Sequence, residues 1–209
     1  MASKVAGQIR ELGGHIKEIA GAKVRDKVME GGEKASKLSD RQKIALWVKD
    51  AIDRLDACTT PEKCRQIMAA CGHTCAAHAS RMTQAVKARR QKYKTEEEFL
   101  KAEAKRPAKF TRMELRGKTL VQYYTPHSYS TPRRCFCGLM FALPEGINAS
   151  PTYCQCSRGF VEKYWEAALG RPGTCSKPGR CESIDCGDQC ASSRSAQPFC
   201  PPNGFAKFG

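Results

Sequence analysis

A chain of 209 residues with 41% hydrophobic content is long enough to bury a sizeable core. No stretch approaches the roughly 18 apolar residues that a membrane helix needs, and the charged N-terminal segment differs from a secretory signal peptide, so we expect a cytoplasmic protein. The net charge of +15 suits an anionic partner, but the Lys and Arg residues are spread along the chain, which favours solvated helix faces over a nucleic-acid patch.

The first half of the chain carries helical patterns. The opening segment is helical in pattern, but Gly13-Gly14 should break it and let it pack loosely. Apolar residues recur at spacings of three and four from Leu38 to Asp56, and Ser39 or Asp40 can cap this amphipathic helix.

Three further helices are expected before Pro107. Thr59-X-X-Glu62 and Pro61 predict the start of a helix that Gly72 should end. Another helix should run from about Ala76 to Tyr93, and the Thr95/Glu98 capping box predicts the last one.

After Pro107 the spacing of apolar residues changes from a helical to a strand-like pattern. Residues 109–125 predict a hairpin that turns at Arg116-Gly117-Lys118, and residues 134–143 and 151–157 predict two more strands. Residues 157–172 form one apolar helix face that ends at Gly170. We therefore expect an α+β fold with a helical region (1–107) and a small antiparallel sheet with a long packing helix (108–172).

Thirteen cysteines are the most unusual feature of the composition. Because the count is odd, complete pairing is impossible, and cytosolic thiols are kept reduced. Cys135/Cys137 and Cys154/Cys156 form two Cys-X-Cys pairs, and residues two apart on a strand share one face. If the two strands are neighbours, four thiols converge, which is typical of a zinc site or, alternatively, an iron–sulfur cluster.

A third pair, Cys71 and Cys75, has i, i+4 spacing, which places both thiols on one face of a helix. Nearby helix amides would lower the thiol pKa, and His73 and His78 would add nitrogen ligands. This pair could replace the Cys-X-Cys ligands or form a second metal site. The alternative is that both cysteines pack in the core, as we expect for Cys58 and Cys64.

Three segments carry a resemblance when taken together: "MAACGHTCA", "RRCFCGLM" and "SPTYCQCSRGFVEKYWEAALGRP". They resemble a family of uncharacterised prokaryotic cytosolic proteins with a cysteine-bearing C-terminal half. That half is distantly similar to 4-vinyl reductase-type domains and to the aminothiazoline-carboxylate hydrolase group. The resemblance covers about residues 60–172. It implies an α/β ligand-binding architecture and no established reaction. The residues that match the helix and turn after the last cysteine pair are Gly159, Phe160, Gly170, Arg171 and Pro172.

The tail, residues 173–209, departs from that pattern because it lacks strand-like apolar alternation. We expect it to be irregular, either disordered or displaced by a frameshift that removes a closing strand from the sheet. A second metal knuckle built from Cys181, Cys186 and Cys190 is the competing interpretation.

Three functional hypotheses follow. The first is a cytosolic metal-binding protein, with zinc in the cysteine site and a pocket for a small ligand. The second is a hydrolase of a small heterocyclic or thioester-like substrate, with Cys71 or Cys154 as nucleophile. The third is a basic nucleic-acid-binding protein. The second hypothesis needs a base, and the four histidines are His15, His73, His78 and His127.

Overall fold

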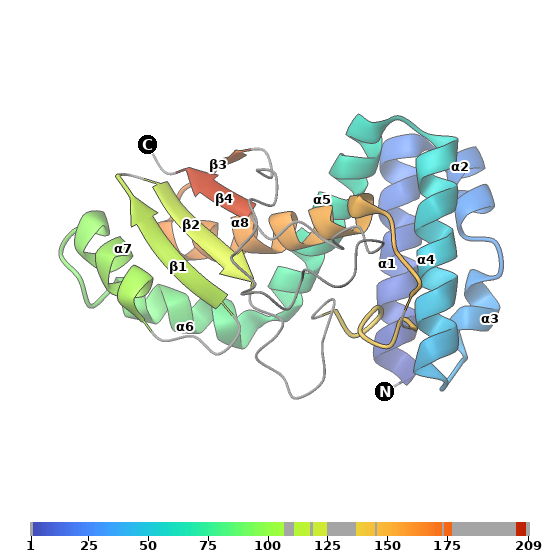
Figure 1. The fold of residues 1–209 in the computed structure, drawn as a ribbon, viewed down its shortest axis with the longest axis horizontal. Coiled ribbons are helices and arrows are strands. Elements are labelled where there is room, and N and C mark those ends of the chain that lie inside the picture. The colour runs from blue at the N-terminus through green and yellow to red at the C-terminus, as the bar shows by residue number, and fades with distance from the viewer. Residues whose placement is uncertain are drawn as a thin grey trace, which may run out of the picture.

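The computed structural model describes residues 2–106, 111–117, 119–124, 137–144, 146–172, 174–176 and 204–207, and it confirms the expected α+β fold (Figure 1). The helices are α1 (Ala2–Ala20), α2 (Ala22–Val28), α3 (Gly32–Ser36), α4 (Arg41–Cys58), α5 (Pro61–His78), α6 (Ser80–Arg90), α7 (Glu96–Lys105), the 3-10 helix η2 (Pro151–Cys154) and α8 (Gln155–Leu169). The strands are β1 (Thr111–Arg116), β2 (Thr119–Tyr124), β3 (Thr174–Ser176) and β4 (Gly204–Lys207). None of the described helices is long and apolar enough to cross a membrane.

The N-terminal helices surround the first of two hydrophobic cores. α4 begins where the Asp40 carboxylate accepts the backbone N–H groups of Gln42 and Lys43, which confirms the predicted cap. In α5 the cap is Thr60, one residue later than expected, with Pro61 in the first turn. The core joins apolar side chains of α1, α2, α4 and the first half of α5 to residues of the segment 139–153.

The predicted break in the opening helix is wrong, because α1 runs unbroken through Gly13 and Gly14. Its buried face carries Ile9, Leu12 and Ile16, and Ile16 is fully inaccessible to solvent. Burial of this apolar face offsets the poor helix propensity of two glycines, which costs about 1 kcal/mol each relative to Ala. The segment therefore packs firmly.

The second core lies between the sheet and three helices. β1 pairs with β2 in the predicted antiparallel hairpin, and Gly117 takes a positive φ of 58° at the turn. α8 passes behind the sheet, with α6 and α7 beside it (Figure 1). Trp165 of α8 is fully buried and donates its indole N–H to Gln122 of β2.

A buried carboxylate ties three helices of this core together. Glu103 of α7 is the one charged residue that is buried in the described part of the chain, at 2% exposure. The Arg89 guanidinium of α6 donates to both of its oxygens, at 2.7 and 3.0 Å, and also to the Tyr164 hydroxyl of α8. Arg106 donates to the same carboxylate at 3.2 Å.

α5 and α8 run from one core to the other and touch through their backbones. A Cβ on Gly72 of α5 would lie 2.0 Å from the Cys156 carbonyl oxygen, and a Cβ on Gly159 of α8 would lie 2.1 Å from the Ala69 carbonyl oxygen. The prediction that Gly72 ends this helix is wrong, because α5 continues to His78. Its missing side chain lets the two helices cross at contact distance.

The prediction of two strands around the cysteine pairs is wrong for the residues that the structure describes. Residues 138–142 form turns, and residues 151–154 form η2, which leads directly into α8. The Ser150 hydroxyl accepts the Thr152 N–H, and Pro151 suits the first turn of a helix, so local capping outweighs the weak strand alternation. Cys154 and Cys156 consequently lie on helical backbone.

The C-terminal tail contributes strands that its sequence pattern did not predict. β4 pairs antiparallel with both β2 and β3, which gives the strand order β1-β2-β4-β3. The closing strand whose loss was considered would start at Cys190, and residues 190–195 lie outside the described ranges, so its loss is not tested. The frameshift and the proposed knuckle of Cys181, Cys186 and Cys190 concern residues outside the described ranges.

Candidate functional site

Cys71 and Cys75 lie on the same face of α5, as the spacing predicted, and this face meets α1. Both are partly buried thiols. Their surroundings include Gln8 and Glu11 of α1, whose side chains act on the pKa of one or both thiols.

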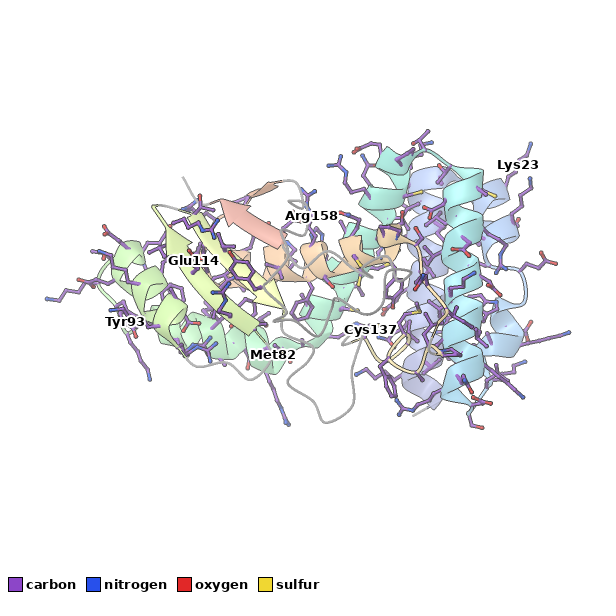
Figure 2. The ribbon with its side chains drawn as sticks, in the orientation of Figure 1. Lys23, Met82, Tyr93, Glu114, Cys137 and Arg158 are labelled. Carbon is purple, nitrogen blue, oxygen red and sulfur yellow. The ribbon has the colours of Figure 1, made fainter. Side chains whose placement is uncertain are left out.

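Cys137 reaches the same region from a distant part of the sequence. It lies beside the N-terminal helices (Figure 2) and packs, like Cys71, against the first hydrophobic core. The buried Tyr153 donates its hydroxyl to the Cys137 sulfur at 3.0 Å. We call Cys71, Cys75 and Cys137 the thiol cluster.

The environment of the thiol cluster disfavours free thiolates. The pKa of the Cys71 thiol is raised to about 12. Burial is the largest cause, followed by the neighbouring Cys75, Glu11 and Cys137. Burial and then the charge of Cys137 raise the pKa of Cys75, although a hydrogen bond with Gln8 opposes this rise. The expectation that helix amides lower these pKa values is wrong, because both cysteines lie far from the N-terminus of α5.

The other predicted ligands are placed differently. Cys154 is disulfide-bonded, which removes its thiolate, and Cys156 occupies the α5–α8 crossing, where its carbonyl faces Gly72. Cys135 lies outside the described residues. Among the residues that the structure describes, no three His, Cys, Asp or Glu side chains are placed to hold a metal ion. The metal assignment stays a prediction.

Cys58 and Cys64 pack as expected. Cys64 is 1% exposed and donates to the Leu55 carbonyl, and burial raises the pKa of its thiol to about 11. Cys58 is partly buried against the first core. Neither cysteine belongs to the thiol cluster.

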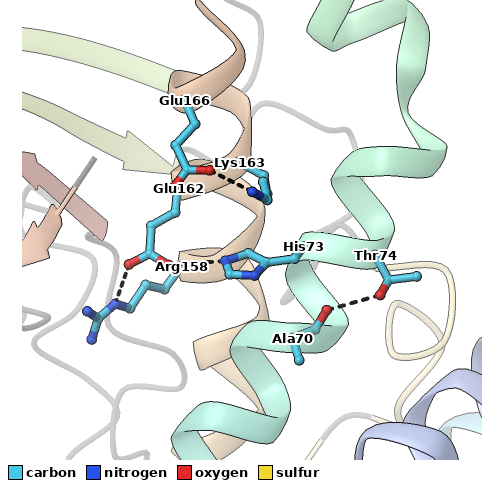
Figure 3. Close-up of polar contacts among 7 residues, drawn as sticks. All are labelled: Ala70, His73, Thr74, Arg158, Glu162, Lys163 and Glu166. Atoms are coloured by element: carbon cyan, nitrogen blue, oxygen red, sulfur yellow. Dashed lines mark hydrogen bonds and ion pairs between the residues drawn. The ribbon is translucent and has the colours of Figure 1, made fainter. Parts of the chain in front are cut away.

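A polar contact that no sequence pattern predicted bridges α5 and α8. His73 Nε2 lies 3.4 Å from Glu162 Oε2, and Arg158 donates to the other oxygen of the same carboxylate at 3.0 Å (Figure 3). The Arg158/Glu162 i, i+4 spacing could have indicated the pair within α8. Only the helix crossing brings His73, 89 residues away in sequence, to this carboxylate.

This contact predicts a pH-dependent contribution to stability. Burial alone would raise the pKa of Glu162, but hydrogen bonds from His73 and Arg158 outweigh it and hold the pKa below the ordinary 4.5. The contribution is thus complete above pH 4.5 and is lost as pH falls through the lower folded-state pKa.

We expect the stability difference between wild type and Glu162→Gln to shrink as the pH falls below 4.5. Urea denaturation at neutral and acidic pH measures it. An equal difference at both would contradict this account. Glu114→Gln is a comparison variant. The pKa of Glu114 is also lowered, chiefly by a hydrogen bond from Arg116, but this carboxylate is more exposed, so solvent screening should make its pH-dependent contribution smaller.

The other two described histidines, His15 and His78, contact side chains across the α1–α5 interface. The Thr74 hydroxyl donates to the Ala70 carbonyl and therefore accepts from His15 Nε2, at 2.9 Å. His78 is 63% exposed and lies 3.5 Å from Glu11. His127 lies outside the described residues.

Comparison with protein-family models, with curated proteins and with solved structures finds no match for this chain. The resemblance to cysteine-bearing prokaryotic proteins therefore stays a prediction.

Proposed function

We propose that the protein binds a soft metal ion, zinc in the first instance, through Cys71, Cys75 and Cys137, with Cys135 as a fourth thiolate. The proposal is supported by the electrostatic influence of Cys137 on the pKa of both Cys71 and Cys75, although Cys137 lies more than sixty residues away from them in sequence. Thiolate sulfur is the preferred donor for zinc and other soft ions.

Binding requires these side chains to move together, since the described residues form no complete coordination set. Rotation about the Cα–Cβ bond relocates a cysteine sulfur without moving the backbone. Tyr153 is positioned to support Cys137 from outside the metal, because its hydroxyl donates to that sulfur.

The hydrolase hypothesis gains no support from the same geometry. A thiol with a pKa of about 12 is protonated at neutral pH, and a disulfide-bonded sulfur is no nucleophile, so neither Cys71 nor Cys154 is activated. A small-ligand pocket and a nucleic-acid surface remain predictions from the sequence.

The direct test is the metal content of the full chain purified without chelator. We expect about one equivalent of zinc in the wild type and its loss in Cys71→Ser/Cys75→Ser, measured by mass spectrometry of the metal. Cys58→Ser is the matched control, because Cys58 is a partly buried helix cysteine outside the thiol cluster. Wild-type protein without stoichiometric metal, in which Cys71, Cys75 and Cys137 alkylate readily, would overturn the proposal.

Zinc affinity should rise with pH. Metal binding must displace protons from thiols whose pKa values are raised, to about 12 for Cys71. Each proton released gives about a tenfold gain in affinity per pH unit, so titrations between pH 6 and pH 8 should show at least that slope. An affinity that does not change with pH would argue against thiolate coordination.

A further inference from the structure

α6 is the one α-helix in the described part of the chain that contains no aspartate or glutamate. Its sequence carries two arginines at its end, and the segment that follows adds Lys92 and Lys94. In other helices carboxylates stand close to the basic residues, as in the 2.6 Å ion pair of Lys49 with Asp53 on α4. The balance of charge seen in those helices is therefore missing along α6.

Four basic side chains of this region are exposed, and none of them forms an ion pair with a carboxylate among the residues that the structure describes. We call these side chains the α6 basic surface: Arg81, Lys87, Lys92 and Lys94. Arg89 and Arg90 do not belong to it, because each donates to an acceptor of the protein itself. α6 lies below the sheet in Figure 1, at the outer edge of the molecule, so a partner can reach this surface.

Helix geometry places the exposed polar side chains of α6 together. Arg81, Gln84 and Lys87 are exposed and lie on the side of the helix that points away from Val86. Val86 is fully buried in the second core. With a rise of about 1.5 Å per residue, Arg81 and Lys87 are about 9 Å apart along the helix axis. The surface therefore presents a row of positive charges.

Helix stability accounts for only part of this charge. A basic residue is favoured near the C-terminus of a helix, where Lys87 lies, and disfavoured near the N-terminus, where Arg81 lies. The glutamates of residues 96–98 do not balance the surface, because they pair with Arg171 and Lys101 or cap α7. This charge is left for an anionic partner.

We propose that the α6 basic surface binds the phosphate backbone of double-stranded nucleic acid, an activity beyond the proposed metal site. Lys and Arg side chains that neutralise phosphates release the counterions condensed on a duplex, which drives binding without reading the base sequence. The net charge of +15 adds long-range attraction to the same partner.

Other anionic partners fit this surface less well. A single strand stacks its bases on exposed aromatic rings, whereas Tyr93, beside Lys92 and Lys94, is partly buried against Phe99. A membrane surface needs an apolar helix face that is free to insert, but the apolar side of α6 lies in the second core. Protein interfaces are anchored by aromatic side chains, and Met82 is the one exposed large hydrophobic residue in the described part of the chain.

The experiment measures binding of the full chain to a fluorescently labelled DNA duplex of about 20 base pairs, by anisotropy between about 50 and 200 mM KCl. We expect the logarithm of the association constant to fall linearly with the logarithm of the salt concentration. Each phosphate contact contributes about 0.9 to this slope, so Arg81→Gln/Lys87→Gln/Lys92→Gln should reduce it by about 2.7. Binding at the lower salt concentration should weaken at least about tenfold.

Lys17→Gln/Lys23→Gln/Lys34→Gln is the matched control. It removes the same charge from three exposed lysines of α1, α2 and α3. Because these lysines lie outside the α6 basic surface, binding should weaken less than about threefold. Circular dichroism checks that both variants keep the fold, since each changes exposed side chains only.

Three results would overturn the inference. The first is the absence of duplex binding by the wild type at about 50 mM KCl. The second is equal weakening in both triple variants, which would mean that net charge alone attracts DNA. The third is tighter binding to poly-glutamate than to the duplex, which would assign the surface to an acidic protein. The α6 basic surface contains none of the proposed metal ligands, so these results leave the metal proposal to its own test.

Discussion

Gly159→Ala should unfold the protein or reduce its free energy of unfolding by more than about 3 kcal/mol. The added Cβ would lie 2.1 Å from the Ala69 carbonyl oxygen and 2.8 Å from the Ala69 Cα. Both atoms belong to the backbone of α5, so no side-chain rotation relieves the clash. α5 and α8 would have to separate, and both hydrophobic cores depend on these helices.

Urea denaturation monitored by circular dichroism measures this effect. Gly14→Ala is the matched control, because Gly14 is a helical glycine and a Cβ added there would have no neighbouring atom within 4 Å. That substitution should raise stability by about 0.5–1 kcal/mol. A Gly159→Ala protein as stable as the wild type would show that the helices do not cross at contact distance.

Arg89→Met should destabilise the protein by about 3 kcal/mol, because it leaves the Glu103 carboxylate buried with Arg106 as its remaining partner. The hydrogen bond to Glu103 raises the pKa of Arg89, so the guanidinium stays charged at every accessible pH. The same substitution removes the donor to the Tyr164 hydroxyl and thus loosens α6 from α8.

A double-mutant cycle distinguishes a buried charge from lost packing. Arg89→Met/Glu103→Leu should recover most of the lost stability, since replacing both members of a buried pair by apolar residues is often close to neutral. Lys101→Met is the control, because its pairing with Glu97 on the same helix is largely exposed and contributes less than about 0.5 kcal/mol. A double variant no more stable than Arg89→Met would contradict this interpretation.

Several helix and hairpin boundaries could be predicted from the chemistry of neighbouring residues alone. The Asp40 cap of α4, the Thr95/Glu98 capping box of α7, the hairpin at Gly117 and the end of α8 at Gly170 all follow from side chains within a few residues. Each of these signals depends on hydrogen bonds or backbone conformations that a short segment can satisfy by itself.

The wrong predictions lie where distant segments decide the local structure. Gly72 is indistinguishable in sequence from a helix terminator, but α8 packs against it, and the same contact explains why Gly159 lies in the middle of a helix. The segment from Pro151 to Ser157 alternates like a strand, yet it begins the helix that joins the two cores. Periodicity over six residues cannot distinguish these outcomes.

The candidate site also has one part that could be predicted from the sequence and one part that could not. That Cys71 and Cys75 share a helix face could be predicted from their spacing, because helix geometry fixes the direction of residues four apart. Packing between distant segments was needed to bring Cys137 to them, to place Cys156 at the helix crossing, and to join His73 to Glu162. The last two contacts depend on how α5 and α8 cross. Burial of the two cores and the two glycines that permit contact set this crossing, and no local pattern encodes it.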